Sequence, residues 1–405
     1  MRNGGAVPAE DRPQDHRAAV AAGFLGWALD AFDFFLVVYC LTAIGHDFHV
    51  GDKEVAFSIF LTLAFRPVGA LIFGLLADRY GRRLPLVLNL VFYSLMEVLS
   101  GLAPNFTTFL VLRALFGIGM GGEWGVGASL TMEKVPARLR GMFSGFLQQG
   151  YALGSLLASI CYFLLFEKTG WRPLFFIGGL PALLAIFVQL RVRESEVWEA
   201  TRAETWRHLG RAIVAQWRLF VYLVVLTTAM NFCSHGTQDM YPTFLQRQWH
   251  YDPRARALLS GISMVGAIFG GLVVGRLSDR VGRRRAMLIA LAGALLAIPL
   301  WAYSPTSALL ALGGFTIQFM VQGAWGVIPA HLSELSPSAV RGFLPGFSYQ
   351  CGALIAGSVA WIEATLSQKM PYATAMALTA GIVFVFAGVA TAAGPERHGA
   401  AFSEP

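Results

Sequence analysis

Long apolar stretches separated by short charged segments run along the whole chain. A helix needs about 20 mainly apolar residues to cross the hydrocarbon of a membrane. Twelve stretches reach that length, near residues 19–44, 54–77, 84–103, 107–131, 141–165, 172–191, 218–245, 256–277, 286–303, 307–332, 342–366 and 372–394. The pattern therefore predicts an all-helical membrane protein with twelve transmembrane helices.

The composition agrees with this interpretation. Of the 405 residues, 56% are apolar and only 14% are charged, whereas about a quarter of the residues of a soluble protein are charged. The net charge of +7 does not indicate a nucleic-acid partner, because the charges lie in clusters between the apolar stretches. The sequence contains no nucleotide loop, nucleophile triad or metal-ligand cluster. We therefore expect neither an enzyme nor a bound metal or cofactor.

Positive charge is distributed unequally between the two ends of the predicted spans. If the N-terminus is cytoplasmic, the inner segments carry 22 Lys and Arg residues and the outer loops carry seven. An excess of Lys and Arg marks the cytoplasmic side of a membrane protein. Both termini are therefore expected inside, as in a multi-pass protein of the cell membrane.

The longest and most highly charged connection lies midway along the chain, at residues 192–217. It divides the spans into two groups of six. We expect an N-terminal six-helix half over residues 1–191, a cytoplasmic linker over 192–217 and a C-terminal six-helix half over 218–405.

The two halves repeat one another at a constant offset of 201 residues. The loop GLLADRYGRR at 74–83 returns as GRLSDRVGRR at 275–284. Other pairs with this offset are Trp124 and Trp325, Glu133 and Glu334, Arg140 and Arg341, and Gln149 and Gln350. Such a repeat predicts two pseudo-symmetric halves.

The repeated GxxxDRxGRR loop suggests a gate at the inner surface. Its Gly permits a tight turn, and its Asp can engage a helix N-terminus or a neighbouring Arg. We expect Asp78 to meet Arg140 and Asp279 to meet Arg341. The residues assigned to this cytoplasmic gate are Asp78, Arg79, Gly81, Arg82, Arg140, Asp279, Arg280, Gly282, Arg283 and Arg341.

This loop resembles the signature loop of the major facilitator superfamily, and the resemblance covers the whole chain. It implies the major facilitator fold, in which the substrate binds between the halves near the bilayer midplane and rocking of the halves gives alternating access. Spans 1, 4, 7 and 10 line the substrate path in that family, so polar residues in these spans are expected to carry the function.

Ionisable residues inside the spans are rare and costly, so each is a functional candidate. Span 1 carries Asp30 and Asp33 on one helix face, span 2 carries Arg66, and span 4 carries Arg113. The run RxxxGxG that begins at Arg113 resembles the span-4 motif linked with proton coupling in this superfamily. Structural ion pairs are the expected role of two further buried acids, Glu97 and Glu123.

Span 7 carries the most specific signal. Asn231, His235 and Asp239 recur every four residues, and Ser234 and Gln238 lie on the same helix face. A polar stripe of this kind is not explained by lipid contact or by core packing, so we expect it to face the substrate path.

The run NxxSHxTQDxxxT at 231–243 resembles the signature of the sialate:proton symporter family, in particular of its Jen-type lactate/pyruvate:proton symporters. The resemblance implies that Asn231, His235 and Asp239 handle substrate or proton. It also implies that Arg66, Gln149 and Gln350 complete a monocarboxylate site. Small monocarboxylates and sialic acids are the two substrate classes of the family, and the short linker favours the former.

The sequence thus predicts a secondary active transporter for a small organic anion and a proton, working as a monomer in the lipid bilayer. The expected substrate-binding residues are Arg66, Gln149, Asn231, His235 and Gln350, with Arg66 as the carboxylate clamp. Proton coupling is expected of Asp33, Asp30, Arg113, His235 and Asp239. The alternatives are a sialic acid:proton symporter, a facilitator of sugars, drugs or other organic anions, and a membrane sensor built on a carrier fold.

Overall fold

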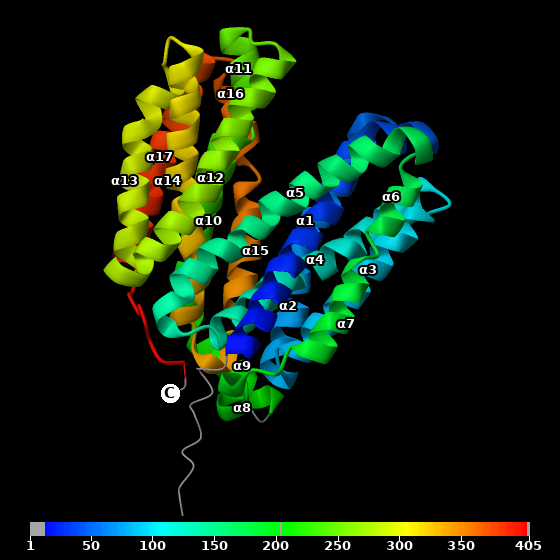
Figure 1. Ribbon diagram of the computed structural model, residues 1–405, viewed down its shortest axis with the longest axis vertical. Coiled ribbons are helices and arrows are strands. Elements are labelled where there is room, and N and C mark those ends of the chain that lie inside the picture. The colour runs from blue at the N-terminus through cyan, green and yellow to red at the C-terminus, as the bar shows by residue number, and fades with distance from the viewer. Residues whose placement is uncertain (1–12, 203–204, 403–405) are drawn as a thin grey trace, which may run out of the picture.

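The computed structural model of the protein describes residues 13–202 and 205–402, which form helices and turns without a β-strand (Figure 1). Arg2 and Arg12, two of the inner charges, lie outside the described residues. The N-terminal helices are α1 (Pro13–Phe48), α2 (Asp52–Tyr80), α3 (Arg83–Gly101), α4 (Phe106–Lys134), α5 (Arg140–Thr169), α6 (Arg172–Ile177) and α7 (Pro181–Arg191). Two helices, α8 (Glu196–Thr201) and α9 (Trp206–Ala215), follow before the C-terminal set. That set comprises α10 (Trp217–Gln238), α11 (Tyr241–Trp249), α12 (Pro253–Val281), α13 (Arg283–Ala302), α14 (Ser307–Leu335), α15 (Leu344–Ala356), α16 (Val359–Leu366) and α17 (Tyr372–Ala393).

Eleven segments of the described chain are long and apolar enough to cross a membrane. The segment predicted over 342–366 differs from the prediction of one continuous helix. It consists of α15 and α16, which are interrupted at Gly357 and Ser358. Each piece is shorter than a bilayer crossing, so the pair together occupies the place of the eleventh span (Figure 1).

Two other spans are also discontinuous. The sixth consists of α6 and α7, with Gly178 and Gly179 in the turn between them. The seventh consists of α10 and α11, and it breaks at Asp239 and Met240, ahead of Pro242. Glycine and proline are the weakest helix formers, which accounts for breaks at these places.

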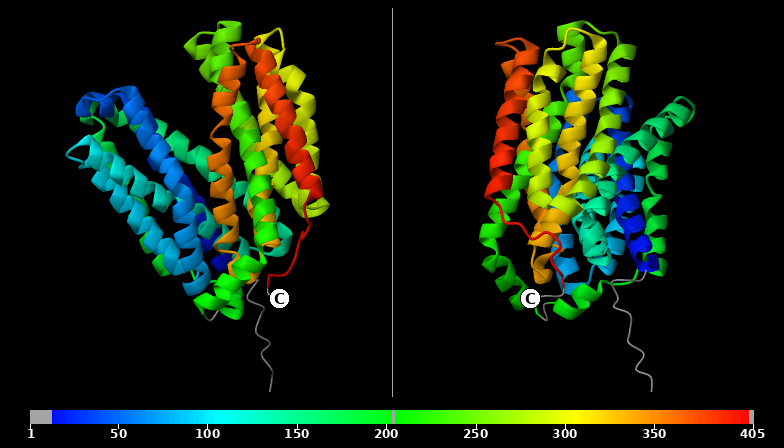
Figure 2. Two further views of the ribbon diagram at one scale, coloured as in Figure 1. Left: turned by 180° about the vertical axis from the view of Figure 1, so that it is seen from behind. Right: turned by 60° about the vertical axis from the view of Figure 1, so that its left-hand side comes forward.

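The helices form two bundles that meet at one end and diverge toward the other (Figure 2). At the meeting end, α5 packs against α12 and α14, and α15 packs against α2 and α4. The linker helices α8 and α9 and the C-terminal segment lie at this end (Figure 1). The charge distribution assigns that end to the cytoplasm, so the halves are closed inside and separated outside. This is an outward-facing arrangement.

Close backbone contact holds the second and fourth spans together. Gly69 of α2 lies on the backbone of Ile118, and Gly117 and Gly121 of α4 lie on the backbones of Thr62 and Arg66. A methyl group on any of these glycines would overlap the facing carbonyl. Small residues at such crossings allow transmembrane helices to pack tightly, and this packing fixes the position of Arg66.

Candidate transport site and cytoplasmic gate

Arg66 lies on α2 beside the contact between the two halves. The residue is 7% exposed, and its Nε and Nη2 atoms have no hydrogen-bond partner among the described residues. The Tyr349 hydroxyl, which comes from α15 of the other half, lies close enough to interact with the guanidinium. A buried guanidinium with unused donors can bind a carboxylate through two parallel hydrogen bonds.

An aromatic cluster joins the halves around Tyr349. The ring centroid of Tyr349 lies 4.3 Å from that of Trp124, 5.7 Å from that of Trp325 and 6.5 Å from that of Trp27. Trp124 and Trp325 are partners in the sequence repeat, so the fold brings equivalent residues of both halves against one ring. The repeat pointed to the two tryptophans, but nothing in the sequence pointed to Tyr349.

Both predicted glutamines lie where the halves meet, in different surroundings. Gln350 donates to the Gly121 carbonyl of the opposite half at 3.4 Å, and Gly121 in turn packs on the backbone of Arg66. Gln149 donates to the Gly145 carbonyl of its own helix at 3.1 Å and lies against Gly271 of α12. Gln350 is thus directly linked to the Arg66 region, whereas Gln149 packs against the opposite bundle.

Arg113 forms its ion pair with Glu97 and not with Asp30 or Asp33. The ion pair expected of Glu97 is therefore present. Asp33 lies next to this pair, since a Cβ atom on Gly178 would meet both the Glu97 side chain and, at 2.8 Å, the Oδ1 atom of Asp33. The ion pair expected of the other acid is absent, because neither carboxylate oxygen of Glu123 has a hydrogen-bond partner among the described residues.

The spans of the N-terminal half bury more acid than base. Asp30 and Asp33 are fully buried, and none of their carboxylate oxygens has a partner in the described part of the chain. Away from the cytoplasmic gate, four buried carboxyl groups face two buried guanidinium groups, namely Asp30, Asp33, Glu97 and Glu123 against Arg66 and Arg113. An unpaired buried charge is expensive. The excess of two acids over the bases therefore favours protonation of part of this set.

The polar stripe of span 7 divides into an exposed pair and a buried residue. The Nδ1 atom of His235 lies 3.1 Å from Oδ2 of Asp239, and both side chains are 42% exposed. Asp239 stands at the break between α10 and α11. Asn231 is buried and donates to the Thr227 carbonyl of its own helix at 2.8 Å. The predicted contact between His235 and Asp239 is present, and it is open to solvent.

The other two members of the stripe join α10 to α14. Ser234 accepts a hydrogen bond from Gln322 at 2.8 Å, and Gln238 donates to Gln318 at 2.8 Å. These two side chains therefore help to hold spans 7 and 10 together, a role that their spacing in the sequence did not reveal.

The cytoplasmic gate consists of two equivalent networks, and the first is centred on Asp78. Its Oδ1 and Oδ2 atoms accept hydrogen bonds from the backbone N–H groups of Gly342 and Phe343, at 2.7 and 2.9 Å. Arg82 donates to Asp78 at 2.6 Å and to both oxygens of Glu133, at 3.0 and 3.3 Å. Burial alone would lower the pKa of Arg82, but the carboxylates of Glu133 and Asp78 raise this pKa above its ordinary value.

The second network repeats the first with the halves exchanged. Asp279 accepts from the backbone N–H groups of Gly141 and Met142, at 2.7 and 3.0 Å. Arg283 donates to Asp279 at 2.8 Å and to the oxygens of Glu334 at 2.8 and 2.9 Å. In both networks, a carboxylate in the last turn of a helix of one half, α2 or α12, binds backbone N–H donors at the start of a span in the other half.

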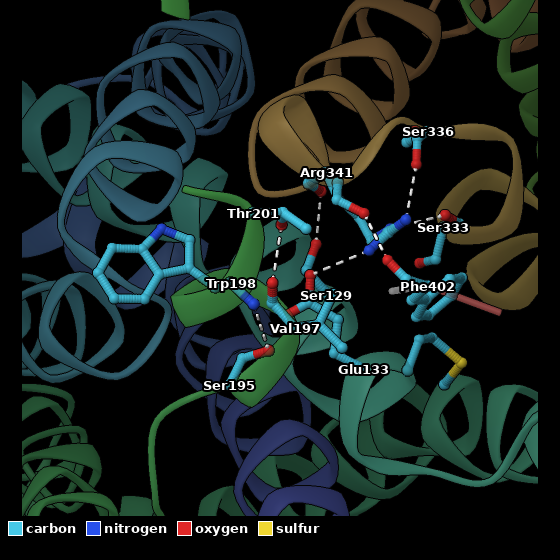
Figure 3. Close-up of polar contacts among 12 residues, drawn as sticks. Ser129, Glu133, Ser195, Val197, Trp198, Thr201, Ser333, Ser336, Arg341 and Phe402 are labelled. Atoms are coloured by element: carbon cyan, nitrogen blue, oxygen red, sulfur yellow. Dashed lines mark hydrogen bonds and ion pairs between the residues drawn. The ribbon is translucent and has the colours of Figure 1, made fainter. Parts of the chain in front are cut away.

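The predicted pairs Asp78–Arg140 and Asp279–Arg341 are therefore wrong. The carboxylates of Asp78 and Asp279 bind the N–H groups that follow each Arg, because a helix start offers unpaired donors and a favourable dipole. Arg140 instead lies 3.8 Å from Glu334, and Arg341 lies 3.5 Å from Glu133. Arg341 also donates to two carbonyls of its own half, those of Ser333 and Ser336 (Figure 3). Burial lowers the pKa of Arg341 to about 10, so the side chain remains charged at neutral pH.

The remaining gate residues play different roles. Gly81 and Gly282 adopt positive φ angles of 102° and 96°, a conformation that favours glycine. Arg79 contacts the ring of Tyr80. Among the described residues, neither Arg79 nor the exposed Arg280 forms a hydrogen bond or an ion pair. These two arginines thus contribute positive charge at the inner surface and no bond within the gate.

The C-terminal segment and the linker cover the gate. The Phe402 ring is buried between two gate guanidiniums, with its centroid 3.4 Å from Cζ of Arg140 and 3.8 Å from Cζ of Arg341. The Phe402 carbonyl accepts a hydrogen bond from Ser338 at 2.7 Å. Trp198 of α8 donates to the Asp78 carbonyl at 2.8 Å, and this helix lies near the same cluster (Figure 3).

Comparison with known proteins agrees with this architecture. The family profile of the Major Facilitator Superfamily matches residues 23–360 and 229–401. The carboxylic acid transporter protein homolog of Saccharomyces cerevisiae is 30% identical, over 95% of this chain and 68% of the relative. The sialic acid transporter NanX of Escherichia coli is 29% identical, over 83% and 84% of the two chains.

The solved structures support the same fold. The proton:xylose symporter XylE superimposes with a TM-score of 0.78 at 19% identity, over 96% of this chain and 98% of that protein. Together with two six-helix bundles and a gate at their meeting end, the family match identifies the chain. It belongs to the Major Facilitator Superfamily and is a multi-pass transporter of the cell membrane, not an enzyme.

Proposed function

We propose that this transporter moves a small monocarboxylate of the lactate or pyruvate type together with a proton. The observation that carries the proposal is Arg66, a buried guanidinium with unused donors at the contact between the halves. Arginine binds carboxylates bidentately, which a lysine in its place cannot do. A relative named as a carboxylic acid transporter protein homolog supports this substrate class.

The substrate site would combine groups from both halves. Arg66 would hold the carboxylate, and Gln350, which reaches α4 beside Arg66, would bind the rest of a small anion. We assign Asn231, His235 and Gln149 to orienting roles at the same interface. All of these groups belong to one chain, so we propose that the protein works as a monomer.

Proton coupling would use the buried acids. The carboxylate oxygens of Asp30 and Asp33 accept no hydrogen bond from the described residues, so these acids can take up a proton when the surroundings become apolar and lose it when water enters. Arg113 would hold this acidic cluster together through Glu97. His235 and Asp239, bonded and exposed, would form the second relay.

Sialic acid is the second candidate substrate, because NanX is a similarly distant relative. Its carboxylate would use the same arginine. A passive sugar facilitator is less well supported, since it has no need for several unpaired acids within the spans.

Uptake into proteoliposomes tests the proposal. Labelled lactate, pyruvate and sialic acid would be offered with and without an inward proton gradient. We expect lactate or pyruvate to accumulate only with the gradient and a protonophore to abolish accumulation. Accumulation that follows a sodium gradient when the proton gradient has collapsed would refute proton coupling, and uptake of sialic acid alone would replace the substrate.

Two variants separate substrate binding from coupling. Arg66→Lys should weaken lactate binding by a factor on the order of ten or more, because the planar fork is lost. Asp33→Asn should abolish accumulation but retain counterflow exchange, because exchange requires no net proton movement. Arg172→Lys and Asp47→Asn are the matched controls, since this exposed outer ion pair should leave both activities unchanged. Wild-type affinity in Arg66→Lys, or accumulation by Asp33→Asn, would contradict these roles.

A further inference from the structure

The C-terminal half buries an acid outside the site and the gate. Glu363 lies on α16, the second piece of the interrupted eleventh span. The residue is fully buried, and neither carboxylate oxygen has a hydrogen-bond partner among the described residues. It faces α10 at Gly236, where a Cβ atom would lie 3.4 Å from Oε1 of Glu363. Gly236 is the residue next to His235.

Within the described part of the chain, the elements packed against Glu363 provide no cation bonded to it. Helix α10 contributes His235, which is bonded to Asp239 at the C-terminal end of this helix. Helix α17 contributes one ionisable side chain, that of Tyr372. On that side, the exposed Arg247 of α11 lies within electrostatic reach of Tyr372. An ionised carboxylate without a partner is far more costly in an apolar wall than its neutral acid. Burial without a partner therefore favours the protonated form of Glu363 in this outward-facing arrangement.

Two interrupted helices surround Glu363. The helix pair α15 and α16 is interrupted just before this residue, and the pair α10 and α11 is interrupted at Asp239. Discontinuous helices surround the sites of many transporters and rearrange as the halves rock. A movement at these two breaks would change the contact of Glu363 with water and with the negative charge of Asp239.

We propose that Glu363 is a second proton-binding residue, which is loaded in the outward-facing state and releases its proton to the inside after the halves rock. This inference rests on the proposed proton-coupled function. One proton would then travel on the N-terminal acids and one on Glu363. A monocarboxylate has one negative charge, so two protons give each cycle a net movement of one positive charge inward.

The charge balance makes the proposal measurable. Lactate uptake is followed in proteoliposomes at a fixed inward pH gradient, with and without an inside-negative potential set by potassium and valinomycin. For one net positive charge, a potential of about 100 mV should raise steady-state lactate accumulation roughly 50-fold. Glu363→Gln keeps the size of the side chain but cannot titrate, so it should keep pH-driven uptake and lose the response to potential. Glu167→Gln, at an exposed acid near the end of α5, is the matched control and should respond like wild type.

Each result decides the question. If wild-type uptake follows the pH gradient but does not respond to the potential, this inference is overturned and the proposed function stays intact. The same holds if uptake by Glu363→Gln still responds to the potential. A carrier that ignores the pH gradient overturns both. If Glu363→Gln does not fold, the wild-type proton-to-lactate ratio, from a pH dye and labelled lactate, supplies the answer. Two protons per lactate support the role of Glu363, and one overturns it.

Discussion

The backbone bonds of Asp78 allow a quantitative prediction about the gate. In the outward-facing structure, its two carboxylate oxygens each accept one N–H group from the opposite half. These bonds must break when the inner side opens. Asp78→Asn leaves one oxygen that can accept, so one of the two bonds is lost together with the negative charge.

The magnitude follows from the number of bonds lost. A hydrogen bond to a charged group contributes about 1.5–3 kcal/mol, and 1.4 kcal/mol is a tenfold change in an equilibrium constant. Asp78→Asn should therefore shift the ratio of outward-facing to inward-facing carriers by roughly 10- to 150-fold toward the inward-facing form. Asp279→Asn should act in the same direction, because Asp279 forms the equivalent bonds.

Spin-label distances between the outer ends of the halves measure this ratio. Labels on Lys168→Cys and Lys369→Cys, at exposed outer positions, would be introduced after the four native cysteines have been replaced. The long distance of the outward-facing form should give way to a shorter one in Asp78→Asn. Transport should slow, while equilibrium binding of substrate stays within a few-fold.

The control is Asp47→Asn, which disrupts an outer ion pair within one half and should leave the distance distribution unchanged. An unchanged distribution in Asp78→Asn would show that these bonds do not bias the equilibrium. Complete loss of substrate binding in a folded Asp78→Asn carrier would refute the separation of gate from site.

Three further outcomes are expected. Phe402→Ala removes the ring between two gate guanidiniums and should also shift the label distances toward the inward-facing form, whereas Phe163→Ala, at an exposed outer position, should not. Gly282→Ala forces a side chain into a positive φ angle at a cost of about 1–3 kcal/mol, so thermal unfolding in detergent should begin at a lower temperature. Gly69→Val should prevent α2 from approaching α4 and abolish the folded monomer in size-exclusion chromatography, and a folded, active variant would contradict the packing described here.

The sequence predicted the location of the gate but not its bonds. The offset repeat singled out Asp78 and Asp279 because matched charges in two loops are unlikely without a shared role. Their partners are backbone N–H groups in the opposite half, and only the docking of the bundles brings these groups within reach. Charged side chains stand out in a sequence, whereas a helix start that lies opposite a carboxylate does not.

Within the site, the sequence indicated which residues are functional candidates but not which residues they pair with. Arg66 and the two span-1 acids were recognisable because a charge inside a span is unusual. The partner of Arg113 could not be recognised from the sequence. It depends on the depth and rotation of α3, which place Glu97 opposite Arg113. The same rule of charge inside a span applies to Glu363. Glu363 lies near the outer end of a span that the sequence predicts as one continuous helix, where a charged residue is expected to be exposed. The break at Gly357 is not marked by a proline, so the sequence did not indicate that Glu363 is buried.

The exchange of contacts between the two gate networks has a consequence for how such a chain can arise. In the terms used for oligomers, the inner contact between the halves is isologous: the same patch occurs on both sides, and each patch supplies both the carboxylate and the helix start. One half alone therefore carries both groups, the carboxylate and the helix start, that this pair of contacts uses. Two identical six-helix chains would close the inner side with the same pair of bonds, so the gate does not require that the halves be joined. The linker would then serve to keep two different halves together once their substrate-facing residues had diverged, and the two halves produced as separate polypeptides should still assemble.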